Sequence, residues 1–217
     1  MSLCFGPPTD LAALEQLQQR VWGCGANEIV PAHLLQAHQH HGACVLEARH
    51  SGELMGLLYS FPGPPGSDYL YSHLAAIAPE LQGRGYGRQL KQAQAEWARE
   101  RGYRRIVWTF DPLQPLNARL NIGRLGAVCS RYLVDYYGEL DDELNRGVPT
   151  DRFEVDWWLV PVSRGPVTET VTFELGVRSR EGTRSRFLDA FSRGLSVLSF
   201  EVIEGRGVYG LGMLDAD

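Results

Sequence analysis

The stretch Pro79-Glu80-Leu81-Gln82-Gly83-Arg84-Gly85-Tyr86-Gly87-Arg88 is the most informative part of the chain. It follows the apolar run Tyr69–Ile77, which indicates a β-strand, and it leads into a helical pattern from Gly87 to Arg101. Glycines let the backbone approach a ligand closely, and the first amides of a helix lack intrahelical acceptors. A strand, a glycine-rich turn and a helix in this order predict a diphosphate site.

The positions of the glycines argue against two other phosphate-binding loops. A kinase-type P-loop needs Lys followed by Ser or Thr after its last glycine, whereas Arg88 and Gln89 stand there. A dinucleotide fingerprint needs the pattern G-x-G-x-x-G, whereas the glycines here stand at 83, 85 and 87. A glycine-rich connector without a ligand is the remaining alternative.

The segment Gln82 to Gly87 resembles the Gln/Arg-x-x-Gly-x-Gly/Ala signature of the GNAT superfamily of acyl-CoA N-acyltransferases. The preceding Ile77-Ala78-Pro79-Glu80 is similar to the end of the family's fourth strand. The resemblance implies acetyl-CoA or another acyl-CoA as co-substrate, with its pyrophosphate on the loop amides and its pantetheine arm on the strand. The cofactor-binding residues implied are Ala75, Ala76, Ile77, Gln82, Gly83, Arg84, Gly85, Tyr86, Gly87, Arg88 and Asn117.

The resemblance also implies a fold class and a domain division. The run from Asn117 to Ala127 resembles the family's fourth helix entering its sixth strand. We therefore expect an α/β GNAT fold, a mixed central β-sheet with helices on both faces, over residues 1–160. The segments Trp108–Pro112, Tyr136–Gly138 and Pro149–Arg152 resemble a poorly characterised branch of the superfamily.

Residues 161–217 lie outside the common core and are expected to form a small α/β extension. The pattern predicts a strand over 167–177, a helix over 183–195 and strands over 197–203 and 208–214. The predicted helix has an apolar face that must be buried. We expect the extension to pack on the core or on a second subunit, which makes a homodimer one expectation.

Composition excludes several classes of protein. The net charge of −5 gives no strongly basic face, so no nucleic-acid partner is expected. No apolar run approaches the roughly 20 residues of a membrane helix, and no signal peptide is recognised. The cysteines Cys4, Cys24, Cys44 and Cys129 form no C-x-x-C pair, which indicates reduced thiols and a cytoplasmic protein without a zinc site.

The chain departs from the family at the usual general acid. Many GNAT enzymes carry a tyrosine four residues before the glycine that closes the fourth helix, and this count from Gly126 reaches Ile122. Asn121 is next to that position and is one candidate to hydrogen-bond the leaving sulfur. Tyr132 and Tyr137, on the following strand, are alternatives.

The general base is also unusual. Tyr71 stands where many relatives carry a glutamate, and His73 follows two residues later. Strand alternation predicts that Tyr71, His73 and Ala75 share one face. Because an imidazole titrates near neutrality, His73 is a candidate base for an ammonium proton, with a structural histidine as the alternative. Tyr71 is a candidate substrate contact.

Two further charged residues are candidate substrate ligands. Asp111 follows a strand and is placed to orient an ammonium group, although a turn role before Pro112 is equally supported. Arg152 suits a substrate carboxylate, and a structural ion pair is its alternative. His38 and His41, one helical turn apart, lack an acidic or cysteine partner nearby and are interpreted as a solvated helix end rather than a metal site.

The sequence therefore predicts an N-acyltransferase that moves an acetyl or succinyl group from coenzyme A to a small-molecule amine, with an amino acid among the candidates. A non-catalytic acyl-CoA sensor is the first alternative, because the usual tyrosine is missing. A protein that binds ATP or NAD through the same loop is the second.

Overall fold

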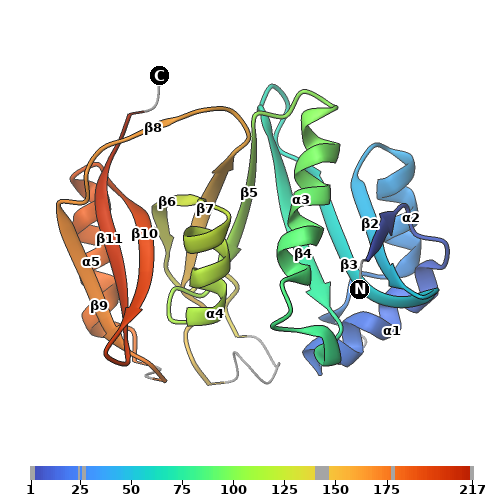
Figure 1. Cartoon of the computed structure of the whole chain (residues 1–217), viewed down its shortest axis with the longest axis horizontal. Helices are drawn as coiled ribbons and strands as arrows, with labels where there is room; N and C mark the ends of the chain where they lie inside the picture. The colour runs from blue at the N-terminus through green and yellow to red at the C-terminus, as the bar shows by residue number, and fades with distance from the viewer. Residues whose placement is uncertain (1–2, 24, 26–27, 140–146, 177–178, 216–217) are drawn as a thin grey trace. The chain divides into compact units, whose positions relative to one another are not determined.

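The computed structural model describes residues 3–23, 25, 28–139, 147–176 and 179–215 (Figure 1). Cys24 and the acidic run 141–143 lie outside the described residues. Contacts divide the described chain into two compact units, one up to Ile106 and one from Val107 onward.

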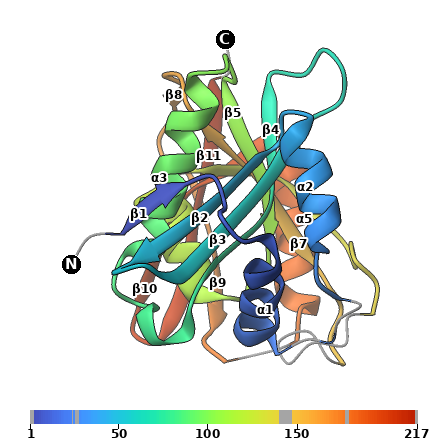
Figure 2. The ribbon, with the colours of Figure 1, turned by 90° about the vertical axis from the view of Figure 1, so that its right-hand side faces the viewer.

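The first unit contains an antiparallel sheet and the helices that cover it (Figures 1 and 2). The sheet has the order β1-β2-β3-β4. Its strands are β1 (Cys4–Gly6), β2 (Cys44–His50), β3 (Glu53–Pro62) and β4 (Tyr69–Ile77). The helices are α1 (Leu11–Trp22), α2 (Ala32–His40), the short η2 (Pro79–Leu81) and α3 (Tyr86–Arg99).

Local sequence signals fix these elements. The carboxylate of Asp10 accepts hydrogen bonds from the amides of Ala12 and Ala13 and caps α1, which ends at Gly23 with φ of 61°. A left-handed residue at this position is a common helix stop, and glycine adopts it without a Cβ clash. The turn between β2 and β3 uses Ser51 and Gly52, with φ of 49° and 85°.

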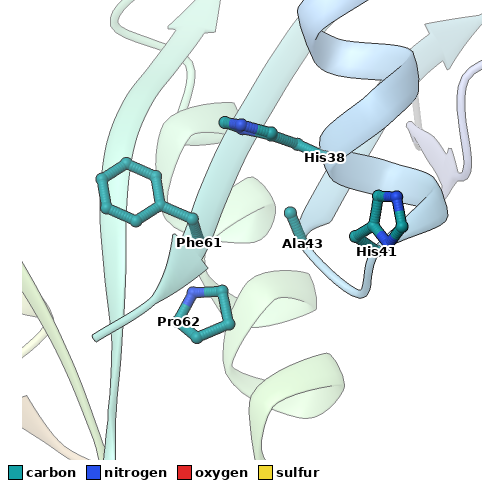
Figure 3. Close-up of a pocket in the computed structure, with 5 residues that line it drawn as sticks. All are labelled: His38, His41, Ala43, Phe61 and Pro62. Carbon is teal, nitrogen blue, oxygen red and sulfur yellow. The ribbon is translucent and has the colours of Figure 1, made fainter. Parts of the chain in front are cut away.

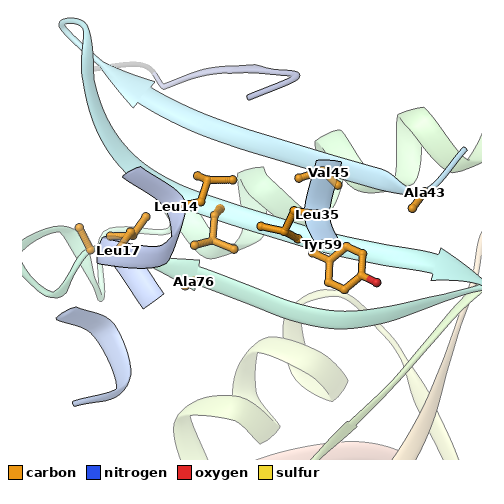
Figure 4. Close-up of a cluster of buried hydrophobic side chains, with 9 residues drawn as sticks. Leu14, Leu17, Leu35, Ala43, Val45, Tyr59 and Ala76 are labelled. Atoms are coloured by element: carbon orange, nitrogen blue, oxygen red, sulfur yellow. The ribbon is translucent and has the colours of Figure 1, made fainter. Parts of the chain in front are cut away.

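The helices of the first unit lie on both faces of its sheet. Leucines of α1 and α2 pack against Val45, Leu57 and Tyr59 in one buried cluster (Figure 4). Because successive residues of a strand point to opposite faces, Ser60 lies on the other face, where Gln94 of α3 bonds it. The sheet is therefore buried on both sides.

The second unit contains the strands from β5 onward. β5 (Arg105–Phe110), of which residues 107–110 belong here, lies next to β7, and the order continues through β6 and β10 to β11. Both β8 and β9 pair with β11. The remaining elements are α4 (Pro115–Ala118), the π-helix η3 (Arg119–Arg124), β6 (Val128–Leu133), β7 (Arg152–Trp158), β8 (Ser163–Arg164), β9 (Glu169–Glu174), α5 (Glu181–Ser192), β10 (Leu195–Ile203) and β11 (Arg206–Asp215).

The C-terminal strands and helix share a core with the rest of the second unit. Phe187 of α5 is fully buried, and its ring contacts Tyr132, Phe153 and Tyr209 at centroid distances of 5.9, 4.7 and 5.5 Å. β10 pairs with β6 through Val197. The strand, helix, strand, strand order predicted after residue 166 is present.

The α/β class predicted from the sequence is confirmed, with two corrections to its elements. The helix predicted over 115–125 has only four α-helical residues and continues as a π-helix, in which the amide of Leu125 bonds the carbonyl of Leu120. The strand predicted over 127–137 ends at Leu133. Over the described residues, no helix has the length and apolar character to span a membrane.

Candidate functional site

The glycine-rich turn forms an open, uncapped helix start. Gly83 and Gly85 have φ of 75° and 85°, a left-handed conformation that glycine adopts readily. A Cβ added at either position meets nothing within 4 Å, so this side of the loop is open. Gly85 is the N-cap of α3, and no side chain caps the helix. The first-turn amides and the exposed Arg84 and Arg88 therefore suit an anionic ligand.

Two residues of the motif support the loop. Gln82 donates a hydrogen bond from Nε2 to the carbonyl oxygen of Ile77, over 3.1 Å. Tyr86, at the first position of α3, is buried. Of the cofactor residues predicted from the motif, Gln82 and Tyr86 thus hold the turn in place.

A β-bulge in β4 sets the position of His73. Tyr59 of β3 pairs with Leu74, whereas the next residue, Ser60, pairs with Ser72. His73 is the extra residue between these two pairs. Bulges redirect side chains and are frequent near functional sites.

The bulge changes which residues share a face. The ring of Tyr59 lies 5.7 Å from the ring of His73, so these two side chains are on the same face of the sheet. Tyr59 also pairs in register with Leu74, which places Leu74 on that face too. Ala75 comes next and points to the opposite face. The prediction that His73 and Ala75 share a face is therefore wrong, whereas Tyr71 remains beside His73 through the ring of Phe61.

Aromatic side chains surround His73, although its own side chain is exposed. The rings of Tyr59 and Phe61 lie 5.7 and 6.1 Å from the imidazole. Partial loss of solvent beside these rings lowers the pKa of His73 below its ordinary value. The imidazole is therefore neutral at pH 7 and able to accept a proton.

A pocket of about 310 Å³ adjoins this aromatic group in the same unit. Figure 3 shows His38 of α2 and Phe61 of β3 on its wall, with His41, Ala43 and Pro62 completing the lining. Nδ1 of His38 is hydrogen-bonded to the hydroxyl of Tyr59. His38 lies in the last turn of α2, as the sequence predicted, but it is partly buried by this bond, whereas His41 is exposed.

On the other face of the sheet, α3 carries a buried polar group. Nζ of Lys91 donates to Oγ of Ser72 over 2.8 Å, and Nε2 of Gln94 donates to Oγ of Ser60 over 2.5 Å. Burial lowers the pKa of Lys91 to about 7. Neither serine pairing was expected from the sequence, because lysine and glutamine at helical spacing usually indicate a solvated face.

In the second unit, Asp111 has a structural partner. Both of its carboxylate oxygens accept hydrogen bonds from Arg180, over 2.7 and 2.8 Å. The side chain of Arg180 is 4% exposed and that of Asp111 13%. The carboxylate of Asp111 is therefore bound to Arg180 of the C-terminal segment. This structural contact does not support the expected role of Asp111 in binding a substrate ammonium group.

Tyr132 is also occupied. Its hydroxyl donates to the fully buried Asp151 over 2.7 Å, and Arg184 binds the two oxygens of the same carboxylate at 2.8 Å each. Burial first, and then Asp151, raise the pKa of Tyr132 far above its ordinary value. Tyr132 is therefore unsuited as a general acid, contrary to the expectation from the sequence.

Arg152 is buried rather than open to a substrate carboxylate. Nη1 donates to the carbonyl of Asp151 over 2.9 Å, and the guanidinium lies 5.3 Å from the ring of Tyr137. Tyr137 is itself hydrogen-bonded to Oγ1 of Thr109. These contacts favour the structural alternative for Arg152.

The two asparagines differ in exposure. Asn117 of α4 is exposed, whereas Asn121 is buried in the π-helix beside the buried Ile122. A π-helix interrupts the ordinary four-residue helical spacing and is frequent at functional sites. The count that places Ile122 at the usual tyrosine position assumes an α-helix throughout.

Tyr59 and Phe61 were not predicted as site residues from the sequence, and His38 was considered only as a metal ligand; all three lie with His73 and Tyr71 on one side of the sheet. The aromatic residues at positions 59 and 61, two apart on β3, were the available signal, but this pattern also describes an ordinary core strand. In the described part of the chain, His, Cys, Asp and Glu form no group of three or more that could hold a metal ion.

Solved structures resemble this chain in fold. They include yncA from Salmonella typhimurium, a putative acetyltransferase with its cofactor acetyl-CoA (17% identity, TM-score 0.59, 77% of this chain and 99% of that one). The ribosomal-protein-S18-alanine N-acetyltransferase from Escherichia coli is also similar (16% identity, TM-score 0.58, 75% of this chain and 97% of that one). A third similar structure is a chimera of the spermidine N-acetyltransferase SpeG from Vibrio cholerae and hSSAT (16% identity, TM-score 0.59, 73% of this chain and 96% of that one). No curated protein sequence matches the chain.

At these identities the structural likeness shows the fold alone. The family assignment comes from the sequence profile of the acetyltransferase (GNAT) family, which matches residues 11–120, about half of the chain. This match contains β4, the glycine-rich turn and α3. The chain belongs to the acetyltransferase (GNAT) family.

Proposed function

We propose that the protein transfers an acetyl group from acetyl-CoA to the primary amine of a small molecule, with succinyl-CoA as an alternative donor. The observation that carries this proposal is the open turn at Gly83 and Gly85, which leads into α3 without a side-chain cap. The structural relatives described with acetyl-CoA support the same donor.

The residues of the turn fit a coenzyme A diphosphate. The absence of Cβ atoms at Gly83 and Gly85 leaves room for phosphate oxygens against the backbone. Amides at a helix N-terminus favour anions, and Arg84 and Arg88 add two exposed cations. Residues Ala75 to Ile77 of β4 are proposed to bind the pantetheine arm, and Asn117 to contact the cofactor.

His73 is the proposed base. A bound acyl-CoA supplies a thioester, and attack by a neutral amine forms the C–N bond as the C–S bond breaks. His73 accepts the proton that the amine must lose, directly or through one water. Its lowered pKa keeps the imidazole available at neutral pH. Tyr71 is proposed to contact the acceptor on the same side of β4.

Tyr132 is held by Asp151, so Asn121 remains the proposed hydrogen-bond donor to the leaving sulfur. The contacts of Arg152 give no support for an acceptor carboxylate at that residue, and those of Asp111 give none for an acceptor ammonium group there. A cytoplasmic location and a homodimer remain predictions from the sequence.

Calorimetry with acetyl-CoA, ATP and NAD tests the loop, using Gly85→Val as the disrupting variant. A branched side chain at φ of 85° both strains the turn and fills the phosphate space. Gly66→Val is the matched control, because Gly66 has φ of 83° and equally open surroundings. We expect only Gly85→Val to abolish binding of acetyl-CoA, and we expect neither ATP nor NAD to bind as tightly.

Thiol release then separates an enzyme from a sensor. The wild-type protein is mixed with acetyl-CoA or succinyl-CoA and a panel of primary amines. Release that depends on the amine supports transfer. Tight acetyl-CoA binding without release for any amine contradicts transfer and favours a sensor.

A further inference from the structure

The pocket beside the aromatic group is built from α2 and β3. Its five lining residues are His38, His41, Ala43, Phe61 and Pro62 (Figure 3). Phe61 links the pocket to the proposed base, because its ring also lies 6.1 Å from His73. Phe61 therefore borders both the pocket and the imidazole of His73.

We propose that the pocket binds the body of the acceptor, a primary amine with one aromatic or bulky apolar substituent and no second ammonium group. This inference rests on the proposed function, since it places the amine of the acceptor at His73.

The size of the pocket supports an aromatic substituent. An apolar protein cavity of about 150 Å³ accommodates benzene. The volume here, about 310 Å³, is roughly twice as large and leaves room for a ring and a short linker. Ala43 contributes a single methyl group to the wall, which keeps this volume open.

The charges around the pocket disfavour a polyamine. Among the residues that the structure describes, its lining contains two imidazoles and no carboxylate. A second ammonium group entering the pocket would lose water without gaining a counterion, which is costly. An aromatic ring, in contrast, gains contact with Phe61 and the edge of Pro62 at no such cost.

The histidine on the wall is held in place. The hydroxyl of Tyr59 is hydrogen-bonded to Nδ1 of His38, and Tyr59 is 3% exposed. The same tyrosine ring contacts His73. Tyr59 therefore fixes both the pocket wall and the proposed base, so the distance between substituent and amine is set by the fold.

Acceptor specificity tests this inference. Rates of thiol release with saturating acetyl-CoA, and separately with succinyl-CoA, are measured for phenethylamine and for L- and D-phenylalanine. Ethylamine, alanine and spermidine are the comparison acceptors. Burial of one ring predicts a kcat/KM about 10- to 100-fold higher for the ring-bearing amine than for its ringless counterpart. A preference for spermidine, or no preference for a ring, would overturn the inference.

Filling the pocket gives the matched experiment. Ala43→Leu is expected to lower kcat/KM for phenethylamine about tenfold or more and to lower kcat/KM for ethylamine much less. Ala37→Leu, on the exposed side of α2, is the control. An equal effect of Ala43→Leu on both amines counts against the pocket. Should Ala43→Leu not fold, His41→Ala enlarges the pocket from an exposed position and is expected to shift preference from phenethylamine toward tryptamine.

Direct binding distinguishes failure of the pocket from failure of the proposed function. Calorimetry measures phenethylamine binding to the wild-type protein with coenzyme A present. Binding that Ala43→Leu abolishes, without thiol release from any amine, supports the pocket and contradicts transfer. Amine-dependent release combined with no phenethylamine binding contradicts the pocket alone. Neither binding nor release contradicts both.

Discussion

Nε2 of Gln82 donates a hydrogen bond to the carbonyl oxygen of Ile77, over 3.1 Å, across the turn that joins β4 to α3. The bond connects the first residue of the glycine motif to the last residue of the strand. It closes the turn on one side and leaves the glycines open on the other. The glutamine of the motif thus shapes the proposed site without needing to touch the ligand.

Replacement of Gln82 is therefore expected to weaken cofactor binding through loop order. Gln82→Leu removes the bond to Ile77 and leaves the glycines in place. We expect about a tenfold loss of acetyl-CoA affinity in calorimetry, near the ~1.4 kcal/mol of one hydrogen bond. Gln89→Leu, at an exposed position of α3, is the control and should bind normally. Unchanged affinity in Gln82→Leu would show that the bond does not organise the loop.

The pH dependence of His73 variants tests the base. Desolvation lowers the pKa of His73, so the part of the acid limb of kcat/KM that belongs to the enzyme should lie below the ordinary pKa of histidine, separate from the titration of the amine substrate at higher pH. His73→Gln retains size and polarity but cannot take the proton, and a base role predicts a loss of about 100-fold at pH 7, partly recovered at high pH. A glutamine variant with wild-type rates across the acid range would rule out this role.

Arg180 and Asp111 form a partly buried ion pair, and breaking it should strongly lower the free energy of unfolding. Arg180→Met leaves the carboxylate of Asp111 with 13% exposure and without its cation. Removal of one partner from a buried pair typically costs about 3–5 kcal/mol of unfolding free energy. Arg193→Met, which breaks exposed pairs with Glu169 and Asp189, is the control and should cost much less. Denaturant unfolding measures both.

Turnover and unfolding of Asp111→Asn distinguish a catalytic role of Asp111 from a structural one. A catalytic role predicts that Asp111→Asn abolishes turnover while leaving stability intact. The structural role predicts a loss of stability with kcat preserved in the folded fraction. Comparing the loss of kcat with the loss of unfolding free energy therefore decides between the two interpretations.

How far the sequence predicted the fold depended on the range of the interactions. The strand before Gln82 and the helix after Gly87 follow from local rules, and the turn between them is encoded in its glycines. The π-helix at residues 119–124 was not predictable, because its apolar pattern is close to that of an ordinary helix. The bulge at His73 depends on pairing with β3, which no local pattern specifies.

The candidate site was predicted less completely for the same reason. The roles of Tyr132, Asp111 and Arg152 depended on partners far along the chain, at Asp151, Arg180 and Tyr137. Charge and residue type indicated a possible catalytic or binding role at each position, but the hydrogen-bond and ion-pair partners of these side chains are known only from the fold. His38 was interpreted as part of a solvated helix end because no acidic or cysteine residue lies near it in sequence, and its hydrogen bond to Tyr59, 21 residues away, depends on the fold.

Lys91 offers a test of the buried polar group on α3. Burial lowers its pKa from 10.5 to about 7, while the unfolded chain keeps the ordinary value. Between these two pH values the unfolded state binds the proton and the folded state does not. Stability therefore rises with pH across this window, by up to roughly 1.4 kcal/mol per pH unit.

The contribution of Lys91 is isolated by comparison with Lys91→Met, which has similar length and no titrating group. The free energy of unfolding of the wild-type protein, minus that of the variant, should increase from pH 7 to pH 10. Because Lys91 is the only lysine, nitrogen-labelled lysine gives a single side-chain signal whose NMR titration reports its pKa directly. A difference in stability that stays constant with pH, together with a titration near 10.5, would show that Lys91 remains charged against Ser72 and that water reaches this face of the sheet.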